Sequence, residues 1–150
     1  MFRIIAVSDG FQHFASGIDE LKKRMPDLQI KCVKAEKSTD SIRIISRETD
    51  RIIELIEKEK LSIIYLDIGA KTYSTEDFGK YIEKISMQHP KFAFVIGGAY
   101  GVDMARLSKY CISTISLSPM TFPHSLALLI LIEQLYRITM IKKGSGYHHG

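Results

Sequence analysis

The stretch FAFVIGGAYG, residues 92–101, indicates the fold. Its first five residues are apolar at every position, which is typical of a strand buried on both faces of a sheet. Gly97, Gly98 and Gly101 follow at once and predict a tight turn at the carboxyl end of that strand. Ligands usually bind at this edge of a parallel α/β sheet, so the glycines are also candidate walls of a binding site.

Strand-like and helix-like segments alternate along the whole chain. The strand-like segments are 2–7, 28–33, 62–66, 92–96 and 112–117, and the segments with helical spacing are 14–25, 40–59, 75–87, 102–110 and 123–141. This alternation predicts an α/β protein with a mostly parallel sheet of five or six strands and helices on both faces. With 150 residues, 45% of them hydrophobic, we expect a single domain over residues 1–150.

The composition limits the functional classes. A formal net charge of +4 permits an anionic partner such as nucleic acid without requiring one. Cys32 and Cys111 lie far apart without metal-ligand spacing, so we predict neither a disulfide nor a metal site and expect a reducing, cytoplasmic location. The longest apolar run, 126–132, has seven residues, whereas a membrane span requires about 20, so no membrane segment is expected.

Local patterns predict two helix features. The helix expected over 40–59 is amphipathic, and its charged residues are interpreted as a solvated face: Arg43, Arg47, Glu48, Arg51 and Glu54. Ser74, with Asp77 three residues later, predicts an N-cap followed by an acidic first turn for the helix expected over 75–87.

The glycines do not match the familiar nucleotide motifs. A dinucleotide fingerprint reads G-x-G-x-x-G and a phosphate-binding loop reads G-x-x-x-x-G-K-[ST], whereas residues 97–101 read G-G-x-x-G. On the glycines alone, a simple turn into the next helix is favoured over a ligand-binding wall.

The segment SLSPMTFPH, residues 116–124, is the second unusual feature. Pro119 and Pro123 stiffen it, and its free backbone groups need partners that a polar ligand could supply. We expect Ser118 or Thr121 to cap the following helix and Pro123 to occupy its first position. That helix is apolar nearly all round over 126–132, which predicts that a second copy of the chain packs against it as a homodimer.

Four motifs in this order resemble the RlmH family of SPOUT-class methyltransferases. The motifs are Ile96-Gly97-Gly98-x-x-Gly101, Leu117-Ser118-x-Met120-Thr121-Phe122-Pro123-His124, Glu133-Gln134-Leu135-Tyr136-Arg137 and Tyr147-His148. The resemblance implies a SPOUT-type α/β fold with a C-terminal trefoil knot. It also implies a homodimer that uses S-adenosyl-L-methionine to methylate N3 of a pseudouridine in large-subunit (23S) ribosomal RNA on the assembled ribosome.

The resemblance assigns roles to individual residues. Contacts with S-adenosylmethionine are implied for Leu66, Gly97, Leu117, Ser118, Pro119, Met120, Thr121 and Phe122. Contacts with RNA are implied for His124, Arg137, Tyr147 and His148. The candidates for catalysis are His124, Glu133, Arg137 and His148, and no general base is chosen among them. From the residues alone, without the resemblance, we would interpret Glu133 and Arg137 as an ion pair on a helix surface. We would likewise interpret the tail from about 142 to 150 as mobile.

The chain departs from the family pattern at four positions. Ala127 and Leu128 stand where a basic residue commonly follows the Pro-His pair, Pro119 where lysine or alanine is frequent, and Gly146 where proline usually precedes the tyrosine. Two alternatives stay open. One is a catalytically impaired, ribosome-associated RNA-binding protein of the same fold, and the other is a small nucleotide-binding α/β domain.

Overall fold

The computed structural model describes residues 2–148, and their strands form one parallel sheet. The strands are β1 (Arg3–Val7), β2 (Gln29–Val33), β3 (Ser62–Leu66), β4 (Phe92–Ile96) and β5 (Cys111–Ile115). Their order in the sheet is β2-β1-β4-β3-β5, and every pairing is parallel. The α/β class and the parallel sheet predicted from the alternation are confirmed. The trefoil knot stays a prediction.

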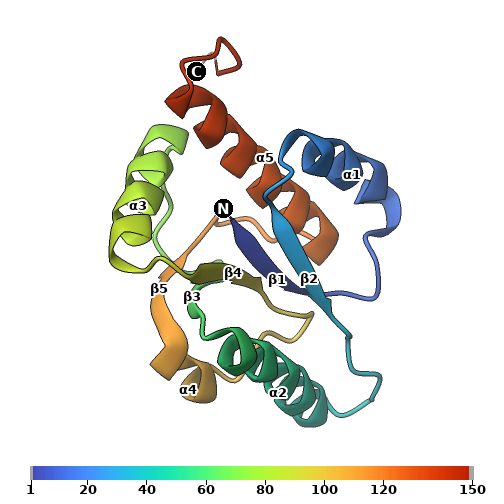
Figure 1. Cartoon of the computed structure of the whole chain (residues 1–150). Coiled ribbons are helices and arrows are strands. Elements are labelled where there is room, and N and C mark those ends of the chain that lie inside the picture. Colours follow the sequence, from blue (N-terminus) through green and yellow to red (C-terminus); the bar gives the residue numbers. More distant parts are fainter. Residues whose placement is uncertain (1, 149–150) are drawn as a thin grey trace.

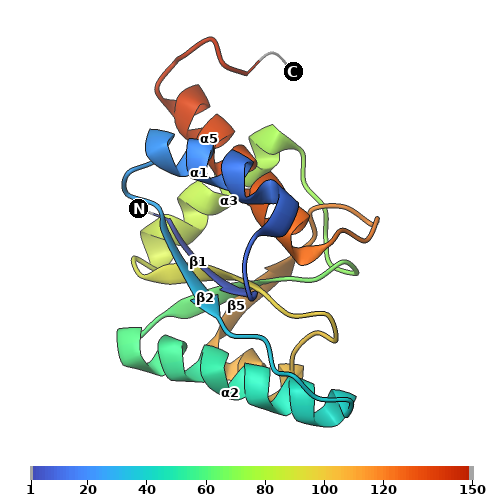
Figure 2. The same cartoon turned by 90° about the vertical axis from the view of Figure 1, so that its right-hand side faces the viewer.

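Helices cover both faces of this sheet. In the described residues they are α1 (Ala15–Arg24), α2 (Ser41–Glu59), α3 (Thr75–Gln88), α4 (Met104–Leu107) and α5 (His124–Lys142), with short 3-10 helices η1 (Gln12–Phe14) and η2 (Ser108–Tyr110). Figures 1 and 2 show α2 and α4 on one face and α1, α3 and α5 on the other. This arrangement confirms the prediction of helices on both faces.

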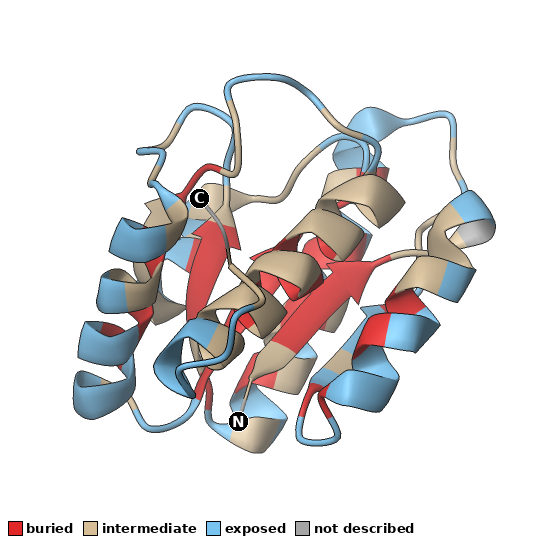
Figure 3. Ribbon diagram, turned by 90° about the horizontal axis from the view of Figure 1, so that it is seen from above, coloured by how far each residue is buried: buried red, intermediate tan, exposed pale blue. Residues whose placement is uncertain are grey.

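The core has two parts, one on each face of the sheet. Strand β4 is buried at every position because it lies in the middle of the sheet, and it alternates between the two parts. Phe94 packs in the part beneath α5, whereas Val95 packs in the part beneath α2. Figure 3 shows the buried residues concentrated on the central strands. A strand with two buried faces needs apolar residues throughout, which explains the sequence of 92–96.

Two expectations about helix starts need correction. The segment expected as one helix over 102–110 is α4 followed by η2, because Asp103 is the N-cap and accepts a hydrogen bond from the Arg106 N–H. Pro123 is the N-cap residue of α5 rather than its first helical residue, since its backbone is extended, and no side chain caps this helix. Ser118 instead accepts a hydrogen bond from the Met120 N–H, at 3.0 Å. The predicted Ser74 cap on α3 is confirmed, at 3.1 Å from the Asp77 N–H.

Helix α5 is more apolar than its longest apolar run indicates. Within residues 2–148 it is the one helix with the length and mean hydropathy, 1.3, of a membrane span. A helix in a protein core or at a subunit interface passes the same test, so this is weak evidence for a membrane. Only 22% of that apolar window is buried within the chain. Most of its other apolar residues are half-buried, so part of their surface has no cover from the described residues.

Candidate functional site

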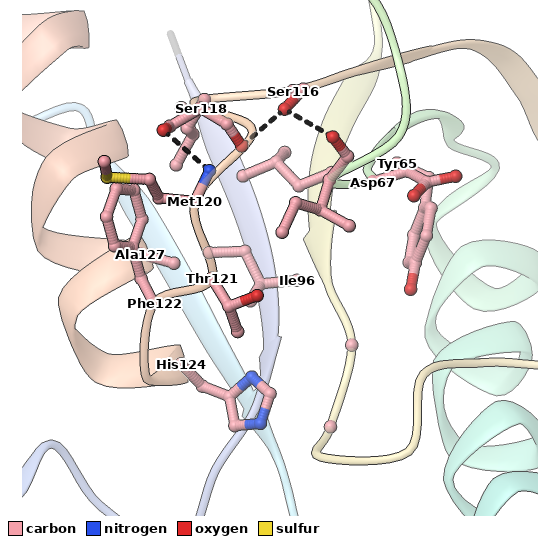
Figure 4. Close-up of a pocket in the computed structure, with 15 residues that line it drawn as sticks. Tyr65, Asp67, Ile96, Ser116, Ser118, Met120, Thr121, Phe122, His124 and Ala127 are labelled. Carbon is pink, nitrogen blue, oxygen red and sulfur yellow. Dashed lines mark hydrogen bonds between the residues drawn. The ribbon is translucent and has the colours of Figure 1, made fainter.

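A cavity of about 200 Å³ lies at the carboxyl edge of the sheet (Figure 4). It is bounded by the ends of β3 and β4, the loop from β5 to α5, and the first turn of α5. Figure 4 shows Met120, Phe122 and His124 on one side of it, and Tyr65 and Asp67 on the other. The lining residues are Tyr65, Leu66, Asp67, Ile68, Ile96, Gly97, Gly98, Ser116, Leu117, Ser118, Met120, Thr121, Phe122, His124 and Ala127.

The cavity gathers the predicted cofactor residues from three separate segments. Seven of the eight line it: Leu66, Gly97, Leu117, Ser118, Met120, Thr121 and Phe122. The eighth, Pro119, is exposed and lies outside the lining. His124, predicted to contact RNA, lines the same cavity. The fold thus brings these side chains together, while their contact with a cofactor stays a prediction.

Hydrogen bonds fix the loop that forms one wall. The Ser116 hydroxyl lies 3.1 Å from the carbonyl oxygen of Ile68 and 2.9 Å from that of Ser118 (Figure 4). The Ser116 N–H donates to the carbonyl of Lys71 at 2.9 Å. These contacts tie the β5–α5 loop to the loop that follows β3. Because the tie is internal, the wall is formed before any ligand binds.

The glycines after β4 form the opposite wall. A Cβ atom at Gly97 would lie 3.0 Å from the Tyr65 hydroxyl oxygen and 3.2 Å from Val102 Cγ1, so both side chains press against the bare Cα. Gly101 has a φ of 79°, in the region that favours glycine, and its N–H donates to the carbonyl of Gly98 at 3.0 Å. The glycines therefore make both the tight turn and the wall.

Glu48 does not lie on the solvated face where the sequence analysis placed it. Its exposed fraction is 2%. One carboxylate oxygen, Oε2, accepts a hydrogen bond from the Glu36 N–H at 2.9 Å, whereas Oε1 has no partner among the described residues. The sequence does contain a signal for this burial. Ile44 and Ile52, both buried, lie four residues before and after Glu48, on the same face of α2.

Two titratable side chains of the cavity have shifted pKa values. Burial lowers the pKa of His124, and the nearby charge of Glu48 offsets part of this by raising it. Burial raises the pKa of Tyr65, and the Asp67 carboxylate raises it further. At neutral pH His124 is therefore an uncharged imidazole that can accept a proton, and Tyr65 keeps its hydroxyl proton.

The remaining predicted RNA and catalytic residues form a second cluster at the other end of α5. Arg137 donates from Nε to Glu133 Oε1 at 2.9 Å, which confirms the predicted ion pair. The Tyr147 hydroxyl donates to the same oxygen at 3.2 Å, and His148 Nε2 lies 2.8 Å from Glu76 Oε1. The hydrogen bond from His148 lowers the pKa of the Glu76 carboxyl. Residues up to 148 of the tail, predicted as mobile, are thus tied to α5 and α3; 149 and 150 lie outside the described residues.

The RNA candidates are therefore divided between two places in one chain. His124 is the first residue of α5, and Arg137 follows 13 residues later. At about 1.5 Å per residue the two lie roughly 20 Å apart. A single chain brings Arg137, Tyr147 and His148 together and leaves His124 at the cavity.

The parallel α/β fold, with a preformed cavity at its carboxyl edge, agrees with a match to a known class of enzyme. Residues 1–148 match the family model described as "Predicted SPOUT methyltransferase", and the chain belongs to this family. It is also similar to curated proteins named ribosomal RNA large subunit methyltransferase H. The protein of Synechococcus sp. is 38% identical, over 88% of this chain and 84% of its own. The protein of Acetivibrio thermocellus is 34% identical, over 91% of this chain and 91% of its own. The protein of Prochlorococcus marinus is also 34% identical, over 98% of this chain and 94% of its own.

These matches confirm the resemblance drawn from the four motifs. Of the two alternatives left open by the sequence, the small nucleotide-binding domain is not favoured, because the chain belongs to a methyltransferase family. The catalytically impaired protein of the same fold is not favoured, because the similar proteins are named as methyltransferases.

Proposed function

We propose that this protein transfers a methyl group from S-adenosylmethionine to N3 of a pseudouridine in large-subunit ribosomal RNA. Membership of the SPOUT methyltransferases gives the reaction class. The name of the similar proteins, ribosomal RNA large subunit methyltransferase H, supports the substrate. The observation that carries the proposal is the convergence of seven predicted cofactor residues, from three separate segments, on one cavity.

The residues of the cavity fit the proposed cofactor. Leu117 and Phe122 offer apolar surface for the flat adenine, and the tied loop between them offers backbone groups for its polar edge. The buried carboxylate of Glu48, with one free oxygen, suits a positively charged ligand. At about 200 Å³ the cavity is smaller than the roughly 300–1,000 Å³ of typical ligand pockets, so the ligand would extend past the mouth near exposed Met120.

The chain's own residues supply positioning and a proton acceptor. When bound, the cofactor supplies an electrophilic methyl group, and most of the rate gain in such a transfer comes from holding the reacting atoms in line. The N3 proton of the base must leave. Of the four candidates for catalysis, His124 alone lines the cavity in the described chain, and burial keeps its imidazole neutral. We assign the role of proton acceptor to His124.

The apolar surface of α5 and the cluster around Arg137 fit the same function. The partly uncovered apolar surface of α5 supports a homodimer, which light scattering would detect as twice the 17.1 kDa of one chain. Arg137, Tyr147 and His148 offer a cation, an aromatic ring and an imidazole for RNA. An antiparallel pairing through α5 would bring this cluster toward the cavity of the partner. The proposed place of action is the cytoplasm, where ribosomes are found.

Transfer of labelled methyl groups to ribosomes that lack the modification tests the proposal. We expect close to one methyl group per large subunit from the wild-type protein. Gly97→Val should abolish incorporation because its side chain would collide with Tyr65 and Val102 and displace the wall. Gly79→Ala, on α3, is the control and should retain activity. A folded wild-type dimer that binds the cofactor and transfers nothing would support the catalytically impaired alternative.

A further inference from the structure

The buried carboxylate of Glu48 is not explained by packing. Oε2 is held by the Glu36 N–H, but Oε1 has no hydrogen-bond partner among residues 2–148, although only 2% of the residue is exposed. A carboxylate oxygen buried without a donor costs free energy. Glu48, which carries this unfavourable burial, lies two turns into α2 and on the side of the molecule where the cavity is.

Gly98 contacts this oxygen and also lines the cavity. A Cβ atom at Gly98 would lie 2.3 Å from Glu48 Oε1, so the oxygen lies directly against the bare Cα, and Gly98 itself lines the cavity. An ion that touched the other side of this Cα, with van der Waals contacts of about 3.5 Å on each side, would lie roughly 7 Å from the carboxylate oxygen.

The charge of Glu48 acts across this wall. His124 lines the cavity from the first turn of α5, on the other face of the sheet from α2, and Glu48 raises its pKa against the effect of burial. Asp67 also lines the cavity, but it is exposed and its Oδ1 accepts a hydrogen bond from the Gly69 N–H at 3.1 Å. Water screens the field of an exposed carboxylate more than that of a buried one. Both carboxylates therefore contribute to the negative field in the cavity, and the field of Glu48, which is buried, is the less screened of the two.

We propose that Glu48 is a binding residue of the cavity that selects a positively charged ligand through the Gly98 wall. The inference rests on the proposed function, in which the methyl donor is a sulfonium cation and the spent product is a neutral thioether. In the transfer the bond between sulfur and the methyl carbon breaks, and sulfur keeps the electron pair. The N3–carbon bond forms and the N3 proton leaves. Because the positive charge on sulfur disappears, Glu48 favours the donor over the product and promotes their exchange.

Calorimetry with S-adenosylmethionine and S-adenosylhomocysteine tests this selection. Glu48→Gln removes the charge and keeps an oxygen for the Glu36 N–H. We expect it to weaken binding of the donor roughly 10-fold, as an attraction across roughly 7 Å in a medium of effective dielectric about 20 allows, and to change product binding less than about 2-fold. Glu54→Gln, the same change at an exposed position of α2, should alter neither affinity.

The outcomes separate the inference from the proposed function. Equal losses for the two ligands, or no loss for either, would overturn the selection by charge. A wild-type protein that binds neither ligand would overturn the proposed function and the inference together. Thermal unfolding of Glu48→Gln should occur at or above the wild-type temperature, since an unpaired buried charge is removed. In the ligand-free protein, NMR titration should give a lower pKa for His124 in Glu48→Gln than in the wild type, and an unchanged value would also overturn the inference.

Discussion

Substitution of Gly98 by alanine tests the packing that places Glu48 behind the cavity. The added methyl carbon would lie 2.3 Å from Glu48 Oε1, 3.1 Å from Glu48 Cδ and 3.2 Å from Val7 Cγ1. The φ angle of Gly98 lies outside the left-handed region, so the cost of the substitution comes from this collision and not from the backbone. A shift of the Glu48 carboxylate away from this methyl group would strain the hydrogen bond that its Oε2 accepts from the Glu36 N–H, at 2.9 Å.

The collision sets the size of the expected effect. Overpacking of a core typically costs about 1–3 kcal/mol, and a buried N–H left without its acceptor costs a similar amount. We therefore expect Gly98→Ala to lower the free energy of unfolding by about 1–3 kcal/mol in urea denaturation. In a chain of this size each kcal/mol lowers Tm by about 2–4 °C. Gly146→Ala is the matched control, because a Cβ there meets nothing within 4 Å, and its effect should stay within about 0.5 kcal/mol.

A double-mutant cycle identifies Glu48 as the cause. Glu48→Ala removes the carboxylate, so Gly98→Ala should cost less than about 0.5 kcal/mol in that background, which gives a coupling energy of about 0.5–3 kcal/mol. Additive effects of the two substitutions would refute the contact between Glu48 and Gly98. So would a Gly98→Ala variant as stable as the wild type.

Three further predictions concern stability. Gly79→Ala should stabilise the chain by about 0.5–1 kcal/mol, because a Cβ in this α3 position makes ordinary contacts of 3.6 and 3.7 Å with Ile138; destabilisation in urea would contradict this packing. Ser74→Ala should cost about 1 kcal/mol through loss of the α3 cap, and an unchanged urea midpoint would exclude a capping role. Burial lowers the pKa of His124, so its contribution to stability is complete above about pH 6.5 and is lost as the pH falls through the folded-state pKa. Wild-type stability should therefore fall more steeply below pH 6.5 than that of His124→Gln, and parallel curves would contradict the burial.

Local sequence patterns were sufficient for most elements of the fold. Runs such as 92–96, apolar at every position, can be buried only in a sheet covered on both faces, and the structure places β4 at the centre of such a sheet. The Ser74 cap could also be predicted from local sequence, since the N-cap residue and the acidic first turn lie within four residues of one another. The shorter helix α4 was missed because Asp103, inside the expected helix, caps it instead.

The environment of Glu48 depends on contacts between distant segments and could not be predicted as easily. On a helix with a charge in nearly every turn, a glutamate is expected in solvent, and the spacing from Ile44 to Ile52 was the only local sign of burial. That this residue lies behind Gly98 follows from the strand order, which sequence spacing does not specify. The same holds for the tail, whose contacts join His148 to Glu76, 72 residues earlier. Similarity to a family located the cavity residues but gave no role to Glu48.

The most direct test of the proposed reaction is the identity of the methylated nucleoside. Large subunits that lack the modification would be incubated with the protein and with S-adenosylmethionine carrying an isotopically labelled methyl group, and the digested RNA would be analysed by liquid chromatography and mass spectrometry. We predict a single labelled nucleoside, pseudouridine with the methyl group on N3. Label on another base or on a ribose, or no labelled nucleoside from protein that binds the cofactor, would contradict the proposed function.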